Sequence, residues 1–365
     1  MSQPDMTLRR RDRLVGRFRR EKVDALLVTN VHNVRYLSGF RGEDSALLVT
    51  RGRTFLLTDA RFTEQAEAET RGLRIITRKQ GMMRAAGVAA LKAEAGRLGV
   101  EAENMTLTQE KELRKWARHM EVRQTCGMVE RLRMVKDATE IAAIRRAAGI
   151  AEEAFRLILP QVRPGKTERE LALALERAMV DLGADAPAFP AIVAAGERSS
   201  MPHAVPTGRR IRSGDAVLFD WGARWQFYHS DLTRVVFLDR IPAIFQRLYP
   251  VVLAAQRRAL ASVRPGRGVR AIDTVARAYL KAHRHGKHFA HGLGHGVGLE
   301  IHEAPGLSPR QDYRLKAGMV ITIEPGVYVP GQGGVRIEDL VLVTRNGHEV
   351  LTSTQKSPEL VLSGP

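Results

Sequence analysis

A short internal repeat constrains the fold of this chain more than any other feature of its sequence. The tetrapeptide VRPG occurs at residues 162–165 and again at residues 263–266. Each copy lies between two stretches with helical patterning, and each helix pair is followed by a β-rich segment. Two successive units of helix, turn, helix and sheet predict two halves related by a pseudo-twofold axis. So short a match also arises by chance, and the repeat therefore needs support from other residues.

The chain has 365 residues, which is too long for one ordinary core, so two domains are expected. Residues 23–58 alternate apolar strands with turns, and residues 85–99 have the pattern of a helix. These features predict a small α/β domain over residues 1–130 and a second domain over residues 131–365. The fold class expected for the whole chain is α+β.

Each predicted half contains one hairpin with two acidic residues in otherwise apolar strands. In the first half, Asp220 and Asp231 lie in two strands around a turn near Gly222. In the second half, Glu324 and Glu338 lie in two strands around the sequence GQGG. For any one of these acids alone, an exposed position or an ion pair with an arginine is the simplest interpretation. Acids in corresponding positions of both halves favour a shared site, because a buried carboxylate is costly unless it is paired or bound to metal.

The segment HGLGHGVGLEIHE, residues 291–303, supplies imidazoles for such a site. It holds three histidines and four glycines. Its alternating glycines disfavour a helical metal clamp and favour an extended backbone. Carboxylates brought together would raise one another's pKa values, and two divalent cations would neutralise four of them. Oxygen ligands with one imidazole suit manganese, cobalt or iron, with zinc as an alternative.

With these residues in view, the sequence resembles the pita-bread metallopeptidases, which include methionine aminopeptidase, prolidase, aminopeptidase P and creatinase. Five blocks carry the resemblance: Asp220-Trp-Gly, Ser230-Asp231-Leu-Thr-Arg234, His291-Gly-Leu-Gly-His295-Gly, Ile323-Glu324-Pro-Gly-Val-Tyr328 and Gly334-Val-Arg336-Ile-Glu338-Asp339. Their order and spacing make the match more specific than any one motif. The resemblance implies a creatinase-like N-terminal α/β domain followed by a pseudo-twofold pita-bread catalytic domain.

The same resemblance implies a dinuclear metal site and a set of catalytic residues. The implied metal ligands are Asp220, Asp231, His295, Glu324 and Glu338. Glu324 would also move the proton from the nucleophile to the leaving nitrogen. His203 and His302 would hold the substrate and its developing oxyanion. For a residue such as His203 taken alone, the ordinary alternative is a histidine of the core or the surface whose ring is hydrogen-bonded and has no role in catalysis.

Three further residues fall at positions that the family uses for substrate contact. His291 matches a residue near the proline pocket, and Tyr328 and Arg336 match residues for substrate contact and proton handling. Arg336 could instead simply balance the charge of the acids.

The N-terminal domain resembles that of the Xaa-Pro peptidases. NVRYLSGF at residues 33–40 and TDARFTEQA at residues 58–66 carry this part of the match. The resemblance implies cleavage after an N-terminal residue that precedes proline. TDARFTEQA favours aminopeptidase P, which takes longer peptides; the alternative is prolidase, which takes only dipeptides. Arg41 is expected to be a solvated loop residue. The alternative is that it binds the carboxylate of a dipeptide, in its own or a partner subunit, and so selects for dipeptides.

The charge of the chain suggests one alternative of a different class. Lys and Arg number 58 against 40 Asp and Glu, for a formal net charge of +18. This charge raises the possibility of a non-catalytic pita-bread protein that binds nucleic acid or protein, but a complete ligand set and the absence of nucleic-acid-binding motifs disfavour it. The single cysteine excludes an intrachain disulfide, and no apolar run has the length of a membrane span. We expect a cytoplasmic homodimer.

Overall fold

The computed structural model describes residues 3–356 and 361–362. The chain divides into two compact units, Met1–Arg133 and Met134–Pro365.

The first unit is built on one six-stranded mixed sheet with the order β4-β3-β2-β1-β5-β6. The central strand β1 pairs antiparallel with β2 and parallel with β5. Apolar side chains of these strands, including Leu27, Leu48 and Leu98, are fully buried in its core. The strands are β1 (Ala25–Val28), β2 (Ser45–Thr50), β3 (Thr54–Thr58), β4 (Arg74–Thr77), β5 (Arg97–Glu101) and β6 (Glu121–Thr125).

The helices of the first unit are α1 (Gln3–Val15), α2 (Phe18–Glu21), α3 (Val31–Ser38), α4 (Thr63–Glu69), α5 (Met82–Lys92), α6 (Leu107–Trp116) and α7 (Glu130–Arg133), with the 3₁₀ turn η1 (Ala60–Phe62). The helix expected over residues 85–99 is partly wrong, because the chain leaves α5 at Lys92 and enters β5 at Arg97. Glu94 has a left-handed φ of 54°, which turns the chain between them. A short buried strand and a buried helix give similar apolar patterns.

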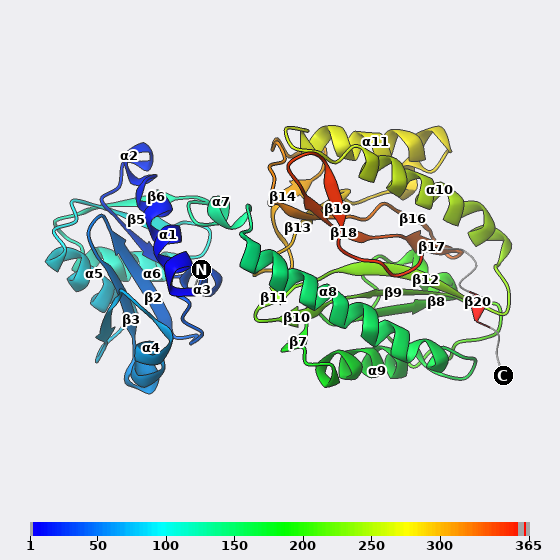
Figure 1. The fold of residues 1–365 in the computed structure, drawn as a ribbon, viewed down its shortest axis with the longest axis horizontal. Coiled ribbons are helices and arrows are strands. Elements are labelled where there is room, and N and C mark those ends of the chain that lie inside the picture. The colour runs from blue at the N-terminus through cyan, green and yellow to red at the C-terminus, as the bar shows by residue number, and fades with distance from the viewer. Residues whose placement is uncertain (1–2, 357–360, 363–365) are drawn as a thin grey trace. The chain divides into compact units, whose positions relative to one another are not determined.

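The second unit contains two helix pairs and two main sheets (Figure 1). The first pair is α8 (Ala138–Ile158) and α9 (Glu168–Asp181), and the second is α10 (Ala243–Ala261) and α11 (Val269–Ala282). One core cluster joins α8 and α9 to strands of the first half, and another joins α10 and α11 mainly to strands of the second half. The α+β class and the pseudo-twofold arrangement expected from the repeat are confirmed.

The first sheet has the order β20-β12-β9-β8 and the second has the order β14-β13-β15-β18-β19. A bridge between Thr233 and Glu338 connects the two halves. The strands of the first sheet are β8 (Ile192–Ala195), β9 (Ala216–Trp221), β12 (Leu232–Leu238) and β20 (Val361–Leu362). Those of the second are β13 (Gly294–Gly296), β14 (Glu303–Leu307), β15 (Val320–Ile323), β18 (Asp339–Val343) and β19 (His348–Val350).

Smaller elements complete the second unit. They are the strands β7 (Ala186–Pro187), β10 (Ala223–Trp225), β11 (Tyr228–His229), β16 (Gly326–Val329) and β17 (Gly333–Arg336), and the 3₁₀ turns η2 (Leu159–Gln161), η3 (Gly196–Ser200) and η4 (Gly286–His288). β16 and β17 form the hairpin expected around GQGG. Across the residues that the structure describes, no helix is long and apolar enough to cross a membrane.

The first acidic hairpin turns at a different place from the one expected. Gln226 and Phe227 make the turn between β10 and β11, with left-handed φ values of 48° and 66°. Gly222 instead lies where the backbone passes closely over its partner strand. A Cβ atom there would lie 1.8 Å from the carbonyl oxygen of Ser230, so only glycine fits this contact.

Gly222→Ala should therefore lower the free energy of unfolding by about 2 kcal/mol or more, because the added methyl group must push two paired strands apart. Urea denaturation of the purified chain measures the change. Gly208→Ala is the matched control, since a Cβ atom at Gly208 meets nothing within 4 Å. Equal stability of the two variants would contradict the close approach at Gly222.

Candidate metal centre

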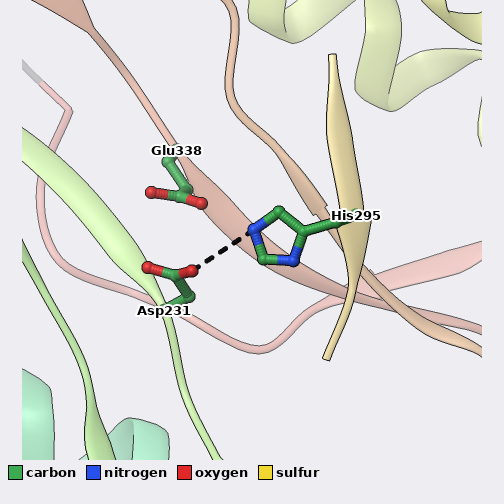
Figure 2. Close-up of side chains that lie close together, drawn as sticks. All are labelled: Asp231, His295 and Glu338. Carbon is green, nitrogen blue, oxygen red and sulfur yellow. Dashed lines mark ion pairs between the residues drawn. The ribbon is translucent and has the colours of Figure 1, made fainter. Parts of the chain in front are cut away.

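Three ligand-type side chains from different segments of the chain converge at the junction of the two halves (Figure 2). Asp231 directly precedes β12, His295 lies in β13, and Glu338 lies between β17 and β18. Each offers one ligand atom, and these atoms all lie within 4.8 Å of one another. His295 Nε2 is 3.4 Å from Asp231 Oδ2 and 3.5 Å from Glu324 Oε1, which adds a second glutamate to the group.

Asp220 lies beside this group and is held by an arginine. Its Oδ2 accepts a hydrogen bond of 2.5 Å from Arg336 Nη2, and both side chains are buried. Asp220, Asp231, His295, Glu324 and Glu338 all line one cavity. The structure thus brings together all five side chains named from the sequence as metal ligands, and their role as ligands stays a prediction.

The hydrogen bonds of His295 leave one ring nitrogen available. Nδ1 lies 3.1 Å from the carbonyl oxygen of Gly296, which makes it the protonated nitrogen that donates to this carbonyl. Nε2 faces the carboxylates of Asp231 and Glu324, and without a proton it would present a lone pair to them. A lone pair facing two carboxylates is stabilised only by a cation or a proton between them, which is how a metal-ligating imidazole is oriented.

The electrostatics of the group favour a cation in the same place. Burial, followed by the charges of Asp220 and Glu324, raises the pKa of Asp231 well above its usual value. Burial and then the neighbouring charge of Asp231 raise the pKa of Glu338 in the same way. Burial also raises the pKa of Glu324. Ionised carboxylates in this position destabilise the chain unless positive charge is supplied.

Two buried oxygens support a fit to divalent cations. Among the described residues, Asp220 Oδ1 and Asp231 Oδ1 are buried and have no hydrogen-bond partner within the chain. A buried oxygen without a partner costs free energy, and coordination to a cation would offset that cost. Carboxylate oxygens with one imidazole are ligands that manganese, cobalt, iron and zinc accept. The residues present therefore fit a divalent metal site.

Two threonines orient the acids, and the sequence analysis did not identify them. Thr233 Oγ1 donates to Glu338 Oε2 over 2.6 Å and accepts from Arg336 Nε over 3.0 Å. Thr322 Oγ1 donates to Glu324 Oε1 over 3.1 Å. Each threonine lies two positions from an acid, Thr233 after Asp231 and Thr322 before Glu324. Residues two apart in a strand share a face, and this spacing was the signal in the sequence.

The acids form one wall of a cavity of about 410 Å³. Phe189, Ile192 and Ile301 contribute an apolar surface, which the sequence analysis also missed. Three imidazoles outside the acid group complete the lining: His203, His291 and His302. A small cavity with an apolar wall and a few polar groups is typical of a site for a small organic ligand.

His291, Tyr328 and Arg336 form one directed chain of hydrogen bonds. Arg336 Nη1 donates to Tyr328 Oη over 2.7 Å, and Tyr328 Oη lies 3.0 Å from His291 Nε2. His291 Nδ1 lies 2.7 Å from the carbonyl oxygen of Gly292, so Nδ1 donates and Nε2 accepts from the tyrosine. Burial lowers the pKa of His291 to about 4 and raises the pKa of Tyr328 to about 12. Both groups are therefore neutral at pH 7.

The other two histidines differ in their surroundings. The ring of His302 lies 4.2 Å from that of His295 in an edge-to-face contact. Burial, and then the neighbouring His295, lowers the pKa of His302, which favours a neutral imidazole. His203 is exposed and lies on the loop that follows η3.

Arg41 lies in the first unit, on the exposed loop between α3 and β2. Its backbone N–H donates to Glu69 Oε2 over 2.8 Å. A role of its side chain in binding a substrate carboxylate stays a prediction.

Two family models match this chain, and the boundary between them lies close to the boundary between the two compact units. The model of metallopeptidase family M24 matches residues 142–345. The model of the creatinase/prolidase N-terminal domain matches residues 10–135. The Xaa-Pro dipeptidase of Pyrococcus horikoshii is 35% identical over 337 residues, which cover 92% of this chain and 95% of that protein.

Solved structures of peptidases are also similar to this chain over nearly its whole length. The chain is similar to an Xaa-Pro dipeptidase from Bacillus anthracis, with a TM-score of 0.95 and 36% identity over 98% of this chain and 100% of the other. It is also similar to an X-Pro aminopeptidase from Thermotoga maritima, with a TM-score of 0.87 and 34% identity over 97% of this chain and 99% of the other.

The raised carboxyl pKa values predict that Glu338→Gln makes the metal-free chain more stable at pH 8. Wild-type Glu338 has a higher pKa in the folded state than in the unfolded state, so its ionisation destabilises the fold above the folded pKa. The advantage of the variant should shrink as the pH falls and the wild-type carboxyl group gains a proton. Urea denaturation in the presence of a chelator, from pH 5 to pH 8, measures the difference.

Glu349→Gln is the control, because its partner Arg145 lowers the pKa of Glu349 and the pair is exposed. Its effect should be small and of opposite sign. A Glu338→Gln variant less stable than the wild type at pH 8 would show that the carboxylates do not repel one another as inferred.

Proposed function

The chain belongs to metallopeptidase family M24, and we propose that it is an Xaa-Pro dipeptidase that cleaves dipeptides with proline in the second position. One observation carries the proposal: buried acids of both halves converge with His295 on a small cavity with an apolar wall. The cavity provides ligands for metal at one wall and an apolar surface for a small substrate at another.

Several expectations from the sequence are confirmed by the family match and by the similar structures. The chain has the pita-bread fold with a creatinase-like N-terminal domain, and it is a metallo-exopeptidase. Membership of family M24 implies divalent metal ions. Membership of a metallopeptidase family disfavours the non-catalytic alternative, a protein that binds nucleic acid or another protein. The cytoplasmic location and the homodimer stay predictions.

The choice between prolidase and aminopeptidase P changes from the one made on sequence. TDARFTEQA favoured aminopeptidase P, but the relatives do not support that enzyme specifically. Similarity to the Xaa-Pro dipeptidases of Pyrococcus horikoshii and Bacillus anthracis supports prolidase better. Similarity to the X-Pro aminopeptidase of Thermotoga maritima keeps aminopeptidase P as the second candidate.

We assign the two divalent cations to Asp220, Asp231, His295, Glu324 and Glu338, with manganese as the first choice and cobalt, iron or zinc as alternatives. When bound, such a pair of cations polarises a peptide carbonyl and activates water for attack on it. The protein contributes ligands from both halves, and Thr233 and Thr322 hold two of the carboxylates in fixed orientations.

Glu324 is the residue placed to move a proton. Burial raises the pKa of its carboxyl group above the usual value, which makes the carboxylate a stronger base. The hydroxyl of Thr322 fixes one of its oxygens, Oε1, which lies 3.5 Å from His295 Nε2. A carboxyl group held in this way can take the proton of the nucleophile and return it to the leaving proline nitrogen.

The three histidines that line the cavity contact the substrate, and the buried Arg336 supports them. His302 and His203 donate hydrogen bonds to the substrate carbonyl as negative charge develops on its oxygen. His291, held by Tyr328, presents a flat ring beside the proline. Arg336 keeps Tyr328 and Asp220 in place through two hydrogen bonds.

Glu324→Gln should lower kcat for Ala-Pro by about 1,000-fold or more while the fold is kept, because the amide cannot take up a proton. Hydrolysis in the presence of Mn²⁺, together with the metal content and circular dichroism of the variant, tests this expectation. Asp181→Asn on the exposed end of α9 is the control and should keep full activity. Full activity of Glu324→Gln would remove this residue from the mechanism.

Kinetics with Ala-Pro and Ala-Pro-Ala separate the two candidate enzymes. A dipeptidase should give a higher kcat/KM for Ala-Pro, because it selects substrates whose carboxylate belongs to the proline itself. If Arg41 binds the substrate carboxylate, Arg41→Ala should raise KM for Ala-Pro about ten-fold or more and leave the exposed control Arg51→Ala unchanged. A higher kcat/KM for the tripeptide would establish aminopeptidase P instead.

A further inference from the structure

One buried carboxylate fixes both ends of the loop that carries His203. The loop runs from Gly196 to Thr207, between β8 and β9, and its histidine lines the cavity. His203 is exposed, so packing around its own ring does not fix its position. The backbone of the loop must then hold it, and the hydrogen bonds of the loop converge on Glu168.

Glu168 is the first residue of α9, and its side chain is fully buried, with 0% exposure. Its Oε1 accepts a hydrogen bond of 2.9 Å from the backbone N–H of Ala195, directly before the loop. Its Oε2 accepts bonds of 3.0 Å and 2.7 Å from the backbone N–H and the hydroxyl of Thr207, at the far end of the loop. One carboxylate therefore sets the separation of the two ends.

Arg198 connects Glu168 to the interior of the loop through hydrogen bonds. Its Nε lies 3.0 Å from both oxygens of Glu168, and its Nη2 donates to the carbonyl oxygen of Val205 over 2.8 Å. Val205 lies two positions after His203. A continuous path of hydrogen bonds thus runs from the buried carboxylate to the backbone next to the histidine.

The N-terminus of α9 binds the same end of the loop. The backbone N–H of Glu168 donates to the carbonyl oxygen of Arg209, and that of Arg169 donates to the carbonyl oxygen of Thr207. These N–H groups lie in the first turn of the helix, where the helix itself offers no acceptor. The loop supplies the acceptors and is bound along its backbone.

On its inner side, the loop is fixed to the strand that carries Arg336. Ser199 is buried, and its Oγ accepts from the backbone N–H of Gly334 in β17 over 2.8 Å. Arg336 Nη1 lies 3.4 Å from the carbonyl oxygen of Pro202, next to His203. The loop is thus held by Glu168 at its ends and by β17 at its middle.

An ion pair that buries one carboxylate, as Glu168 does with the partly exposed Arg198, is weak evidence for stability, because the cost of removing the carboxylate from water offsets much of the attraction. The donors that Glu168 accepts from belong to the two ends and the interior of one loop. Its geometry is better explained by the need to define the shape of that loop. From these contacts we propose that Glu168 is a positioning residue for hydrolysis, acting through His203. The inference rests on the proposed function, in which His203 contacts the substrate.

A double-mutant cycle on the full-length chain, loaded with Mn²⁺ and assayed with Ala-Pro, tests the inference. His203→Ala should lower kcat/KM by about 100-fold, as expected for the loss of one oxyanion donor. Glu168→Gln should lower kcat/KM by about ten-fold or more in the wild-type background and by less than about two-fold in the His203→Ala background. Its Mn²⁺ affinity should equal that of the wild type, because the acid group is untouched.

Glu170→Gln is the matched control, since Glu170 lies on the same turn of α9, is exposed, and contacts the capping residue Thr167. It should leave kcat/KM unchanged in both backgrounds. If Glu168→Gln does not fold, Thr207→Val, which removes only the 2.7 Å bond to the carboxylate, takes its place in the cycle.

Equal losses from Glu168→Gln with and without His203 would overturn the inference, because the effect would then not pass through the histidine. Loss of Mn²⁺ affinity in Glu168→Gln would overturn it as well. A His203→Ala variant with full activity would also remove the basis of the inference, and it would locate the failure in the proposed role of His203 rather than in the geometry of the loop.

Discussion

The repulsion among buried carboxylates is the constraint on which the rest of this structure depends. Asp231 and Glu338 are 4% and 2% exposed. Burial raises both pKa values, and so do neighbouring carboxylates, Asp220 and Glu324 for Asp231 and Asp231 for Glu338. A fold that held such groups together without positive charge would lose stability at neutral pH. Arg336 supplies part of that charge through Asp220, and the unpartnered oxygens leave room for more. Bound metal at these residues, as proposed, would supply the missing positive charge.

The two halves of the second unit explain how the acids reach one another. Each half has its acids in a strand or directly beside one, and the bridge between Thr233 and Glu338 joins the halves at the site. The hydroxyl of Thr233 donates a hydrogen bond to Glu338 and accepts one from Arg336. One side chain thus orients both an acid of the site and the arginine that balances its charge. Behind this wall, Asp339 pairs with the buried Arg234, which shows how adjacent acids in one strand serve opposite faces.

The acids could be predicted from the sequence because each lies in or beside an apolar strand, where a carboxylate needs a special reason. Side-chain alternation along the strand predicts that Thr233, two positions after Asp231, lies on the same face as that acid. Threonine is so common in strands, however, that its presence there does not indicate a role in the site. The turn at Gln226 was missed because non-glycine residues rarely adopt left-handed φ values. Glu168 could not be found at all, since its partners lie far along the chain and it reads as an ordinary acid in the first turn of a helix.

The most direct test of the metal centre is isothermal titration of the chelated chain with Mn²⁺ at pH 7, repeated in buffers of different ionisation enthalpy. The account predicts two ions bound per chain and a net release of protons, because raised carboxyl pKa values keep some protons on the metal-free site. Glu338→Gln should abolish at least one binding event. Absence of binding, or binding of the wild type and the variant with equal stoichiometry and affinity, would contradict the claim that these carboxylates are gathered to hold metal.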